Sequence, residues 1–505
     1  MESIAELLTN CFKKQNKKTA LSFLRGNTLE TRMSFGDLDL NSNKMANLFL
    51  KQGVKKSDNV VLLLDKSLAF IVAYIALQKI GAVSVPLNPG FKKSELTYLL
   101  NDAAPSMVII NQELAGMIKQ IDSKLNCLEM DTQIPFQTLD ILKSCSGDLE
   151  TTSLAPDDPG LIIYTSGTTG DPKGAVLTQK NLVNDAKNII TIWEISDSDT
   201  LCHSLPLFHV HGLCFALHTA LISGANIVMP DKFDPGVVID ILKKNKTDLA
   251  CSIFMAVPAM YSKLMDAFQD QTPCFDHIRL LTSGSAPLPA KEFQRITRTF
   301  GKEPVEREGM SETGMNFSNP LNGKKKPGSI GLPLPRVKVR IVDPDTLLDV
   351  EPGQTGEFWL KSDSIITGYW KKPEKTAGAF EKGWFKTGDL GKKDSDGYYY
   401  LTDRLKNIII TGGENVSPNE IERVINKLDG VIESSVLGIL DEKWGEKIVA
   451  TVVKTPASGD ISEAIKAICK EHLHDWKCPK QIIFIKKLPR NTMGKILKEE
   501  LKKLF

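Results

Sequence analysis

The stretch that decides the fold is NVVLLLDKSLAFIVAYIALQKIGAVSVPLNPGFKKSELTYLLNDAAPSMVII, residues 59–110. Short apolar runs alternate in it with longer helix-like segments, the runs at 59–64, 83–88 and 106–110 and the segments at 66–82 and 92–103. Continuous apolar runs of this length are typical of strands buried on both faces, and helices between them are typical of βαβ units. The stretch therefore predicts an α/β fold on a mostly parallel sheet.

The same rhythm recurs at 225–287, with ANIVMP, PGVVIDILKKN, CSIFMAV and HIRLLTSGSAP. Beyond residue 330 the sequence pattern changes to short strand-like segments separated by turn residues, VKVRIVD, GEFWLKS and GYYYLTD. This pattern is typical of antiparallel strands. After Asp403 the pattern becomes compact α+β. We predict a large domain of βαβ layers with a small β-rich part over residues 1–402, and a small mobile α+β domain over 403–505.

Composition narrows the class of protein. The chain has 505 residues, of which 42% are hydrophobic, and its 63 basic residues nearly balance 61 acidic ones. This balance gives no reason to expect nucleic acid or an anionic membrane as a main partner. No segment resembles a secretory signal or is long enough to span a bilayer, so we expect no integral membrane segment and a cytoplasmic or organelle-soluble protein. Monomer and homodimer both stay open.

Metal-ligand patterns are absent from the sequence. The nine cysteines form no CxxC pair, and the seven histidines form no HExxH motif. An odd number of scattered cysteines is typical of free thiols in a reducing compartment. We therefore expect no zinc site.

A loop rich in hydroxyl groups follows the apolar run that begins GLIIY, and the whole stretch is GLIIYTSGTTGDPKG at 160–174. Its glycines let backbone N–H groups approach an anion closely, its hydroxyls donate hydrogen bonds, and Lys173 supplies charge. It is not a Walker loop, because the lysine follows proline and precedes glycine. By itself the loop fits a phosphate site and an ordinary solvated loop about equally.

Further motifs resolve this ambiguity. LPLFHVHG at 205–212, SGSAPL at 283–288, EREGMSET at 306–313, KTGDLG at 386–391, DRLKNIIITGGENVSPNEIE at 403–422 and PRNTMGK at 489–495 follow in order. Together with TSGTTGDPKG, this ordered set resembles the adenylate-forming superfamily of acyl-CoA synthetases and luciferases. The resemblance covers essentially the whole chain.

The resemblance implies that ATP activates a carboxylate as an acyl-adenylate, with release of pyrophosphate, and that CoA then takes the acyl group. Two anions must be brought together in the first step, so cations and hydrogen-bond donors are needed around the phosphates. The family's motifs assign the phosphate loop to Thr165, Ser166, Gly167, Thr168, Thr169, Gly170 and Lys173. They also assign a phosphate contact to Ser311, and Mg²⁺ to Glu312.

Other nucleotide contacts follow from the same resemblance. Ser285, Ala286 and Pro287 of SGSAPL fall on the nucleotide side, and so does Glu308. Asp389 of TGD would accept hydrogen bonds from the ribose hydroxyls, with help from Arg404. Taken alone, Asp389 would be an ordinary turn aspartate.

The C-terminal motifs imply two half-reactions. Lys495 resembles the family's catalytic lysine, which bridges the substrate carboxylate and the α-phosphate, although a late lysine is usually a solvated charge. The family's small domain swings at the position of Asp403. Its other orientation would present Gly412 and Gly413 to the pantetheine arm of CoA, where a bare backbone leaves room.

The acyl site is assigned to the HVHG region with His209, to the AVPAMY segment, and to Met315 and Asn316. The motifs resemble most the malonyl-CoA synthetase branch, and a second substrate carboxylate would need a fixed cation. Arg279, just before SGSAPL, is the candidate, since a guanidinium can hold a carboxylate with two hydrogen bonds. Its alternative role is a surface ion pair. We therefore rank malonate or another short dicarboxylate first, followed by oxalate and by medium-chain or aryl acids.

One residue departs from the family's pattern. An aromatic side chain that stacks on adenine usually stands four residues before the magnesium glutamate, where this chain has Glu308. Losing the stack would weaken nucleotide binding by roughly 1 to 3 kcal/mol. Glu308 could turn away, could reduce ATP affinity, or could be a mutation, and we expect activity to survive in weakened form. A catalytically impaired nucleotide sensor and delivery of the acyl group to a carrier protein are the two other hypotheses.

Overall fold

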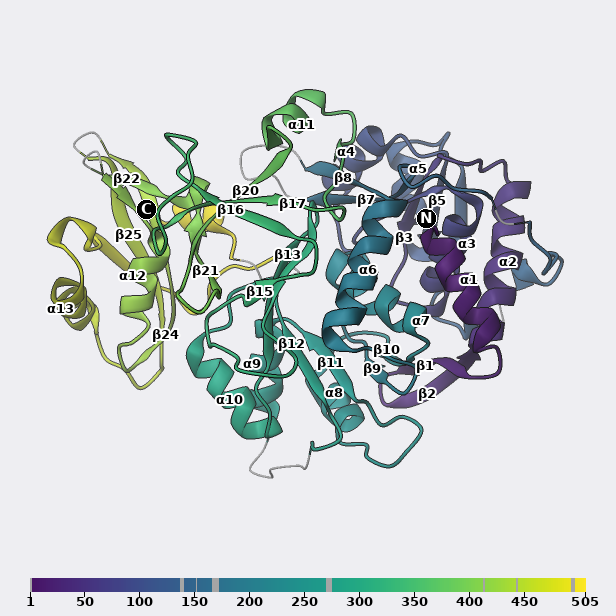
Figure 1. The fold of residues 1–505 in the computed structure, drawn as a ribbon, viewed down its shortest axis with the longest axis horizontal. Helices are drawn as coiled ribbons and strands as arrows, with labels where there is room; N and C mark the ends of the chain where they lie inside the picture. Colours follow the sequence, from purple (N-terminus) through teal and green to yellow (C-terminus); the bar gives the residue numbers. More distant parts are fainter. Residues whose placement is uncertain are drawn as a thin grey trace. The chain divides into compact units, whose positions relative to one another are not determined.

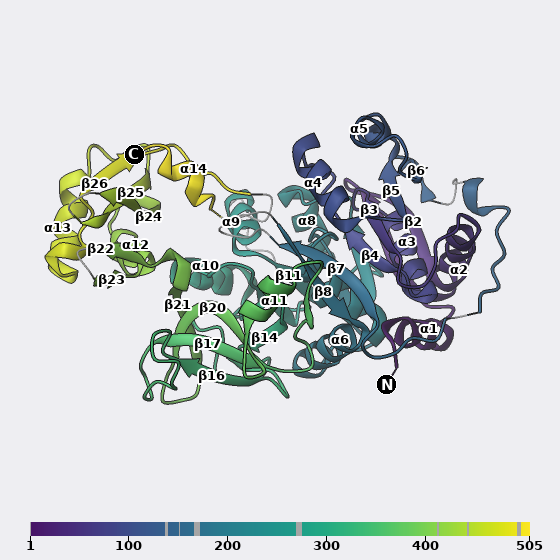
Figure 2. The same ribbon diagram turned by 90° about the horizontal axis from the view of Figure 1, so that it is seen from above.

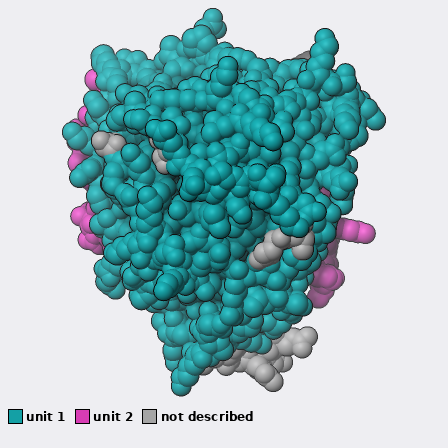
Figure 3. Space-filling model, turned by 90° about the vertical axis from the view of Figure 1, so that its right-hand side faces the viewer, with its two compact units in different colours: residues 1–338, 361–385 teal, residues 339–360, 386–505 magenta. Residues whose placement is uncertain are grey.

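The computed structural model describes residues 2–136, 140–150, 152–165, 172–268, 275–411, 414–441, 444–491 and 496–505. The chain divides into two compact units, coloured separately in Figure 3. Unit 1 comprises residues 1–338 and 361–385, and unit 2 comprises 339–360 and 386–505. A hinge at residue 403 stays a prediction, because compactness defines a unit and not a motion.

A seven-stranded sheet forms one layer of unit 1. Its order is β18 (Gly368–Tyr369), β8 (Lys173–Thr178), β7 (Pro159–Thr165), β4 (Val83–Pro86), β3 (Asn59–Leu63), β5 (Met107–Asn111) and β6 (Cys127–Met130). The strands from β7 to β6 are parallel, as residues 59–110 predict. Strands β8 and β18 extend this sheet as antiparallel additions.

A second sheet of nine strands has the same character. Its order is β15 (Leu332–Pro333), β14 (Gly314–Ser318), β13 (Val305–Met310), β12 (Leu280–Ser283), β11 (Ile253–Ala256), β9 (Thr200–Cys202), β10 (Asn226–Pro230), β1 (Thr19–Arg25) and β2 (Thr28–Ser34). From β13 to β1 the pairs are parallel, whereas β14, β15 and β2 are antiparallel additions at the edges.

Helices cover these sheets (Figures 1 and 2). They include α1 (Ile4–Lys14), α2 (Phe35–Lys51), α3 (Leu68–Ile80), α4 (Lys93–Ala103), α5 (Ala115–Ile121), α6 (Gln179–Trp193), α7 (Thr219–Ser223), α8 (Pro235–Leu242), α9 (Pro258–Ala267), α10 (Ala290–Phe300) and α11 (Pro373–Ala379). All residues of α3 are buried, as expected of a helix that is apolar on every side. It ends at Gly81, whose φ of 72° suits the left-handed cap.

Unit 2 is the α+β part. It contains β16 (Lys338–Val342), β17 (Gly356–Lys361), β20 (Trp384–Lys393) and β21 (Tyr399–Arg404), followed by β22 (Ile409–Thr411), β23 (Glu414–Val416), β24 (Val431–Asp441), β25 (Gly445–Lys454) and β26 (Gln481–Phe484). Its helices include α12 (Pro418–Ile425), α13 (Ser462–His472) and α14 (Lys498–Lys502). A core that includes Ile421, Val436, Ile448 and Ile465 joins α12 and α13 to strands β24 and β25.

The predicted α/β class is confirmed, and the antiparallel additions matter most for the site. Hairpin β7–β8 pairs Thr165 with Lys173, and hairpin β13–β14 pairs Met310 with Gly314. The connection of the first hairpin contains the predicted phosphate loop, and the turn of the second contains Ser311 and Glu312. The residues that flank the first group, Thr165 and Lys173, and the second group itself thus belong to antiparallel hairpins at the edges of the parallel sheets.

Candidate functional site

The phosphate hairpin is anchored at its base by hydroxyl groups. Tyr164 donates a hydrogen bond from Oη to Asp102 Oδ2 at 2.7 Å, and Tyr98 donates one to the carbonyl oxygen of Pro172 at 3.0 Å. The predicted ligands Ser166, Gly167, Thr168, Thr169 and Gly170 lie outside the described residues. Thr165 and Lys173 therefore mark where the loop leaves and re-enters the sheet.

Glu312 contacts this hairpin at Thr165, where the predicted phosphate loop begins. Its side chain is buried in the turn between β13 and β14, next to the half-buried Ser311. Oε1 accepts hydrogen bonds from Thr165 Oγ1 at 3.3 Å and from Tyr369 Oη at 3.2 Å. Lys173 Nζ lies 4.2 Å from the centre of the Tyr369 ring. The structure thus brings the predicted metal ligand and the predicted phosphate lysine to one place.

The donor chemistry here fits Mg²⁺. Two hydroxyls occupy Oε1 of Glu312, and within the described ranges no hydrogen bond reaches Oε2. Mg²⁺ prefers hard oxygen ligands and is commonly held by one or two carboxylates together with substrate phosphates and water. The described residues contain no group of three or more His, Cys, Asp or Glu side chains that could hold a metal. A single carboxylate suits an ion that arrives with a nucleotide.

Two histidines, His209 and His211, belong to the HVHG segment that the resemblance assigns to the acyl site. The helix η4 (His211–His218), a π-helix, follows HVHG, and Ser285 Oγ lies 3.2 Å from His211 Nδ1. Burial lowers the pKa of His209 to about 4 and holds the pKa of His211 well below its usual range. Both imidazoles are therefore uncharged at neutral pH. They can accept or donate a hydrogen bond, but they cannot neutralise an anion.

Arg307 is the residue that sequence reasoning missed. Its side chain is 2% exposed, and Nε, Nη1 and Nη2 have no hydrogen-bond partner among the described residues. The guanidinium lies 5.0 Å from the Phe215 ring centre and packs on Gly284, where an added Cβ would stand 2.6 Å from Arg307 Cζ. Burial lowers its pKa to about 10, so it stays cationic at neutral pH. A buried cation without a partner is costly unless a ligand supplies the anion.

Arg279, the predicted carboxylate ligand, is engaged elsewhere. Its Nε and Nη2 donate to the two carboxylate oxygens of Asp199, both at 2.7 Å. Nη1 donates to the carbonyl oxygen of Trp193, and Nη2 also donates to that of Glu194. Four of its five N–H groups are thus used, which fits the alternative role of an ion pair, and the assignment of Arg279 as a carboxylate ligand stays a prediction.

Glu308 points toward the acyl residues. Its Oε2 accepts a hydrogen bond from Asn316 Nδ2 at 3.1 Å, across the β13–β14 hairpin. Asn316 and Met315 are fully buried, and the Met315 amide donates to Asp185 Oδ1 at 2.8 Å. Glu308 therefore has a structural partner, which is compatible with the turned-away orientation among those considered. The effect on ATP affinity stays a prediction.

The SGSAPL segment contacts the HVHG segment through Ser285. Ser285 has a φ of 69°, which is costly for a residue other than glycine. Ser285 and Pro287 are exposed, and Ala286 is half-buried. The next residue, Leu288, is buried, and its amide donates a hydrogen bond to Glu306 Oε1 at 3.3 Å. The loop thus leaves two of the three predicted nucleotide contacts, Ser285 and Pro287, exposed to solvent.

Unit 2 holds the remaining predictions. Arg404 Nε lies 2.8 Å from Asp389 Oδ1, across the β20–β21 pair, so the two predicted ribose residues meet. Asp403 accepts hydrogen bonds from Ser417 Oγ at 2.6 Å and from the amide of Asn419 at 3.1 Å. The predicted Lys495, Gly412 and Gly413 lie outside the described residues, and their roles stay predictions.

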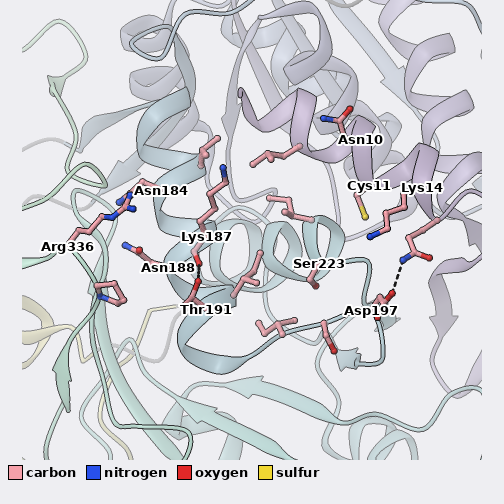
Figure 4. Close-up of a pocket in the computed structure, with 18 residues that line it drawn as sticks. Asn10, Cys11, Lys14, Asn184, Lys187, Asn188, Thr191, Asp197, Ser223 and Arg336 are labelled. Atoms are coloured by element: carbon pink, nitrogen blue, oxygen red, sulfur yellow. Dashed lines mark hydrogen bonds between the residues drawn. The ribbon is translucent and has the colours of Figure 1, made fainter. Parts of the chain in front are cut away.

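A cavity of about 1000 Å³ lies apart from these residues, among α1, α6 and α7 (Figure 4). Lys14, Lys187, Asp197 and Arg336 give it charged walls, and no predicted site residue lines it. Helix α6 separates the two places: Lys187 lines the cavity, while Asp185 contacts the site through Met315. In the part of the chain that the structure describes, no helix is long and apolar enough to cross a membrane.

The fold and this site define an enzyme that handles a nucleotide and a carboxylic acid. The chain belongs to the AMP-binding enzyme family, whose model matches residues 8–370, and the model of the AMP-binding enzyme C-terminal domain matches 420–495. It is an ATP-dependent, AMP-forming acid–thiol ligase, that is, an acyl-CoA synthetase. The predicted family is therefore confirmed.

Similar proteins use different acids. The indoleacetate–CoA ligase of Aromatoleum aromaticum is 32% identical, over 96% of this chain and 95% of its own length. The mitochondrial malonate–CoA ligase of Bos taurus is also 32% identical, over 93% and 86%. ATP-bound MatB from Rhodopseudomonas palustris superposes with a TM-score of 0.93 at 33% identity, covering 99% of this chain and 98% of that one. Overall identity therefore does not select the acid.

Proposed function

We propose that this acyl-CoA synthetase activates malonate or another short dicarboxylate. Arg307 carries the proposal, because the three nitrogens of its buried guanidinium have no hydrogen-bond partner among the described residues and it lies beside Phe215, in the helix that follows HVHG. A planar guanidinium binds a carboxylate through two parallel hydrogen bonds. Malonate would place one carboxylate for reaction and the other on Arg307. A monocarboxylic acid of the same size would bring no second carboxylate to this cation.

The neighbouring groups support a single anion at this point. His209 and His211 are neutral, so they add no competing positive charge. Asp185 and Glu308 influence Arg307 by their charge, and both raise its pKa, but neither forms a hydrogen bond with it. A bound carboxylate would supply the hydrogen-bond acceptors that these two side chains do not supply to Arg307.

In the proposed reaction, the free carboxylate attacks the α-phosphorus of ATP, and pyrophosphate leaves. Mg²⁺, when bound, would neutralise phosphate charge, and Glu312 is the residue that would hold it. Lys173 lies on the same side as Glu312 and would bind the β and γ phosphates. Lys495 would bridge the attacking carboxylate and the α-phosphate. The thiol of CoA then attacks the acyl carbon, and AMP leaves.

The test is a panel of acids with the native protein, ATP and Mg²⁺. Malonate and propionate have three carbons each and differ in the second carboxylate, so they form a matched pair. We expect faster pyrophosphate release with malonate and, after CoA is added, malonyl-CoA by mass. Preference for propionate or for an aryl acid would contradict the dicarboxylate assignment. Absence of pyrophosphate with every acid would favour a nucleotide sensor.

The two half-reactions can be separated at Lys495. Lys495→Ala should abolish adenylation and leave thiolysis of supplied acyl-AMP largely intact, because only the first step uses the lysine. Equal loss of both steps would contradict the assignment. Accumulation of acyl-AMP that stays unchanged in the presence of CoA would indicate delivery to a carrier protein instead.

A further inference from the structure

Tyr369 is a residue outside the predicted site that contacts two of its members. It lies on the short strand β18, is 8% exposed, and pairs with Ala175 of β8. Its hydroxyl donates to Glu312 Oε1, and its ring lies under the ammonium group of Lys173. One side chain therefore contacts both the predicted metal ligand and the predicted phosphate lysine.

The backbone around Tyr369 is fixed on both sides. The Trp370 amide donates to the carbonyl oxygen of Gly174 at 2.8 Å, and the Ile366 amide donates to that of Glu312 at 2.9 Å. The Tyr369 amide itself donates to Thr376 Oγ1 at 2.9 Å. Segment 366–370 thus connects the β7–β8 hairpin to the Glu312 turn. Because both ends are held, the backbone that carries the tyrosine ring is fixed relative to the hairpin and to the Glu312 turn.

The hydroxyl contact has a direction that matters for metal binding. Tyr369 and Thr165 both donate to Oε1, so within the described residues the other oxygen, Oε2, is left to face a ligand. Thr165 Oγ1 and Tyr369 Oη stand 3.3 Å and 3.2 Å from Oε1. The carboxylate is therefore held in one orientation before any ion arrives.

The ring contact acts on Lys173. A lysine side chain has many rotamers, and a cation held over an aromatic face loses some of that freedom in advance. The indole of Trp370 donates to the carbonyl oxygen of Asp102 at 3.0 Å, on the same side of the hairpin. The ring contact thus holds the Lys173 ammonium group beside β18, whose Tyr369 also contacts Glu312.

We propose that Tyr369 is a positioning residue for nucleotide and metal binding, orienting Glu312 through its hydroxyl and Lys173 through its ring. This inference rests on the proposed roles of Glu312 and Lys173. The hydroxyl and the ring of Tyr369 thus have separate roles, which different substitutions can remove. Removing the hydroxyl should affect metal-dependent binding, and removing the ring should also affect nucleotide binding without metal.

The experiment uses Tyr369→Phe and Tyr369→Leu in the full chain, with Tyr400→Phe as the matched control. Tyr400 also donates to a carboxylate, Asp394 Oδ2 at 3.1 Å, and Asp394 is not one of the predicted site residues. Calorimetry measures binding of a non-hydrolysable α,β-methylene ATP analogue over a range of Mg²⁺ concentrations. Pyrophosphate release supplies kcat and the KM for ATP and for the acid.

We expect Tyr369→Phe to raise the Mg²⁺ concentration needed for tight binding about tenfold, as for the loss of one hydrogen bond to a charged group. Binding without metal should stay unchanged, and excess Mg²⁺ should restore the native rate. Tyr369→Leu should weaken metal-free binding as well, by about threefold, because the cation–π contact is lost. The KM for the acid should change in neither variant.

The inference is overturned if Tyr369→Phe leaves the Mg²⁺ dependence unchanged, or if it weakens binding with and without metal equally. An equal effect of Tyr400→Phe would also overturn it. Failure of the native protein to bind the analogue at all would instead count against the proposed nucleotide site, so the two failures are distinguishable.

Discussion

The phosphate side and the acyl side of unit 1 treat their charged groups in opposite ways. Glu312 has Oε1 occupied by Thr165 and Tyr369, whereas Arg307 has three nitrogens without a partner in the described part of the chain. A carboxylate that must meet a metal needs orientation, which neighbouring hydroxyls supply. A guanidinium that must recognise an acid needs free N–H groups, and Arg307 keeps them because neither Asp185 nor Glu308 forms a hydrogen bond with it. Preorganisation thus takes two forms within one site.

The largest effect should come from the phosphate side. Glu312→Gln keeps the shape of the side chain but removes its charge, and Gln is a much weaker ligand for Mg²⁺. We expect adenylation to fall by about 100-fold or more, by the same factor for every acid, since the change lies away from the acyl wall. Pyrophosphate release with malonate and propionate measures it. A loss confined to malonate would contradict the division between the two sides.

The next effect concerns the acyl side, where a substitution should raise the stability of the protein in the absence of substrates. Arg307→Met replaces an unpartnered buried cation with an apolar side chain of similar length, and we expect stabilisation by about 1 to 3 kcal/mol. Differential scanning calorimetry without substrates should show a higher transition midpoint for the variant. A lower midpoint would indicate that Arg307 has an internal partner in solution, and it would remove the basis for a vacant cation.

The smallest effect concerns the neutral histidines. Burial lowers the pKa of His218 from 6.5 to about 3, and its Nε2 lies 2.7 Å from Tyr74 Oη. The unfolded chain binds a proton below about pH 6.5 and the folded chain does not. Stability is therefore retained above that pH and is lost as pH falls, by up to about 1.4 kcal/mol per pH unit.

His218→Gln should reduce this dependence, because glutamine can accept the Tyr74 hydrogen bond but does not titrate. Thermal midpoints of both proteins between pH 7 and pH 5 measure it, and the variant should lose less stability on acidification. Parallel curves would show that His218 is not excluded from protonation in the folded state.

Sequence pattern predicts the parallel sheets well, because burial on both faces leaves a continuous apolar run such as 59–64. It predicts the site less completely. Glu312, Thr165 and Lys173 belong to contiguous motifs and are brought together, but Tyr369 reaches Glu312 from 57 residues away along the chain. Such a contact depends on which strands are neighbours, and a single sequence does not state that.

Arg307 and Arg279 also show that a single sequence does not reveal tertiary partners. Both are arginines near a recognisable motif, and only the tertiary partners distinguish them. Asp199, which occupies Arg279, lies 80 residues earlier in the sequence. A signal for Arg307 was nevertheless present: it stands inside β13, directly after the buried Val305 and Glu306, where a charged residue needs a reason.

The most direct test of the proposed dicarboxylate specificity is kcat/KM for malonate and propionate with the native protein and with Arg307→Met. We expect the variant to lose about 30-fold or more with malonate, the cost of removing one partner of a buried charge pair. With propionate it should lose nothing or gain, so the preference collapses or inverts. Equal losses with both acids, or an unchanged preference for malonate, would contradict the assignment of Arg307 as the cation that binds the second carboxylate.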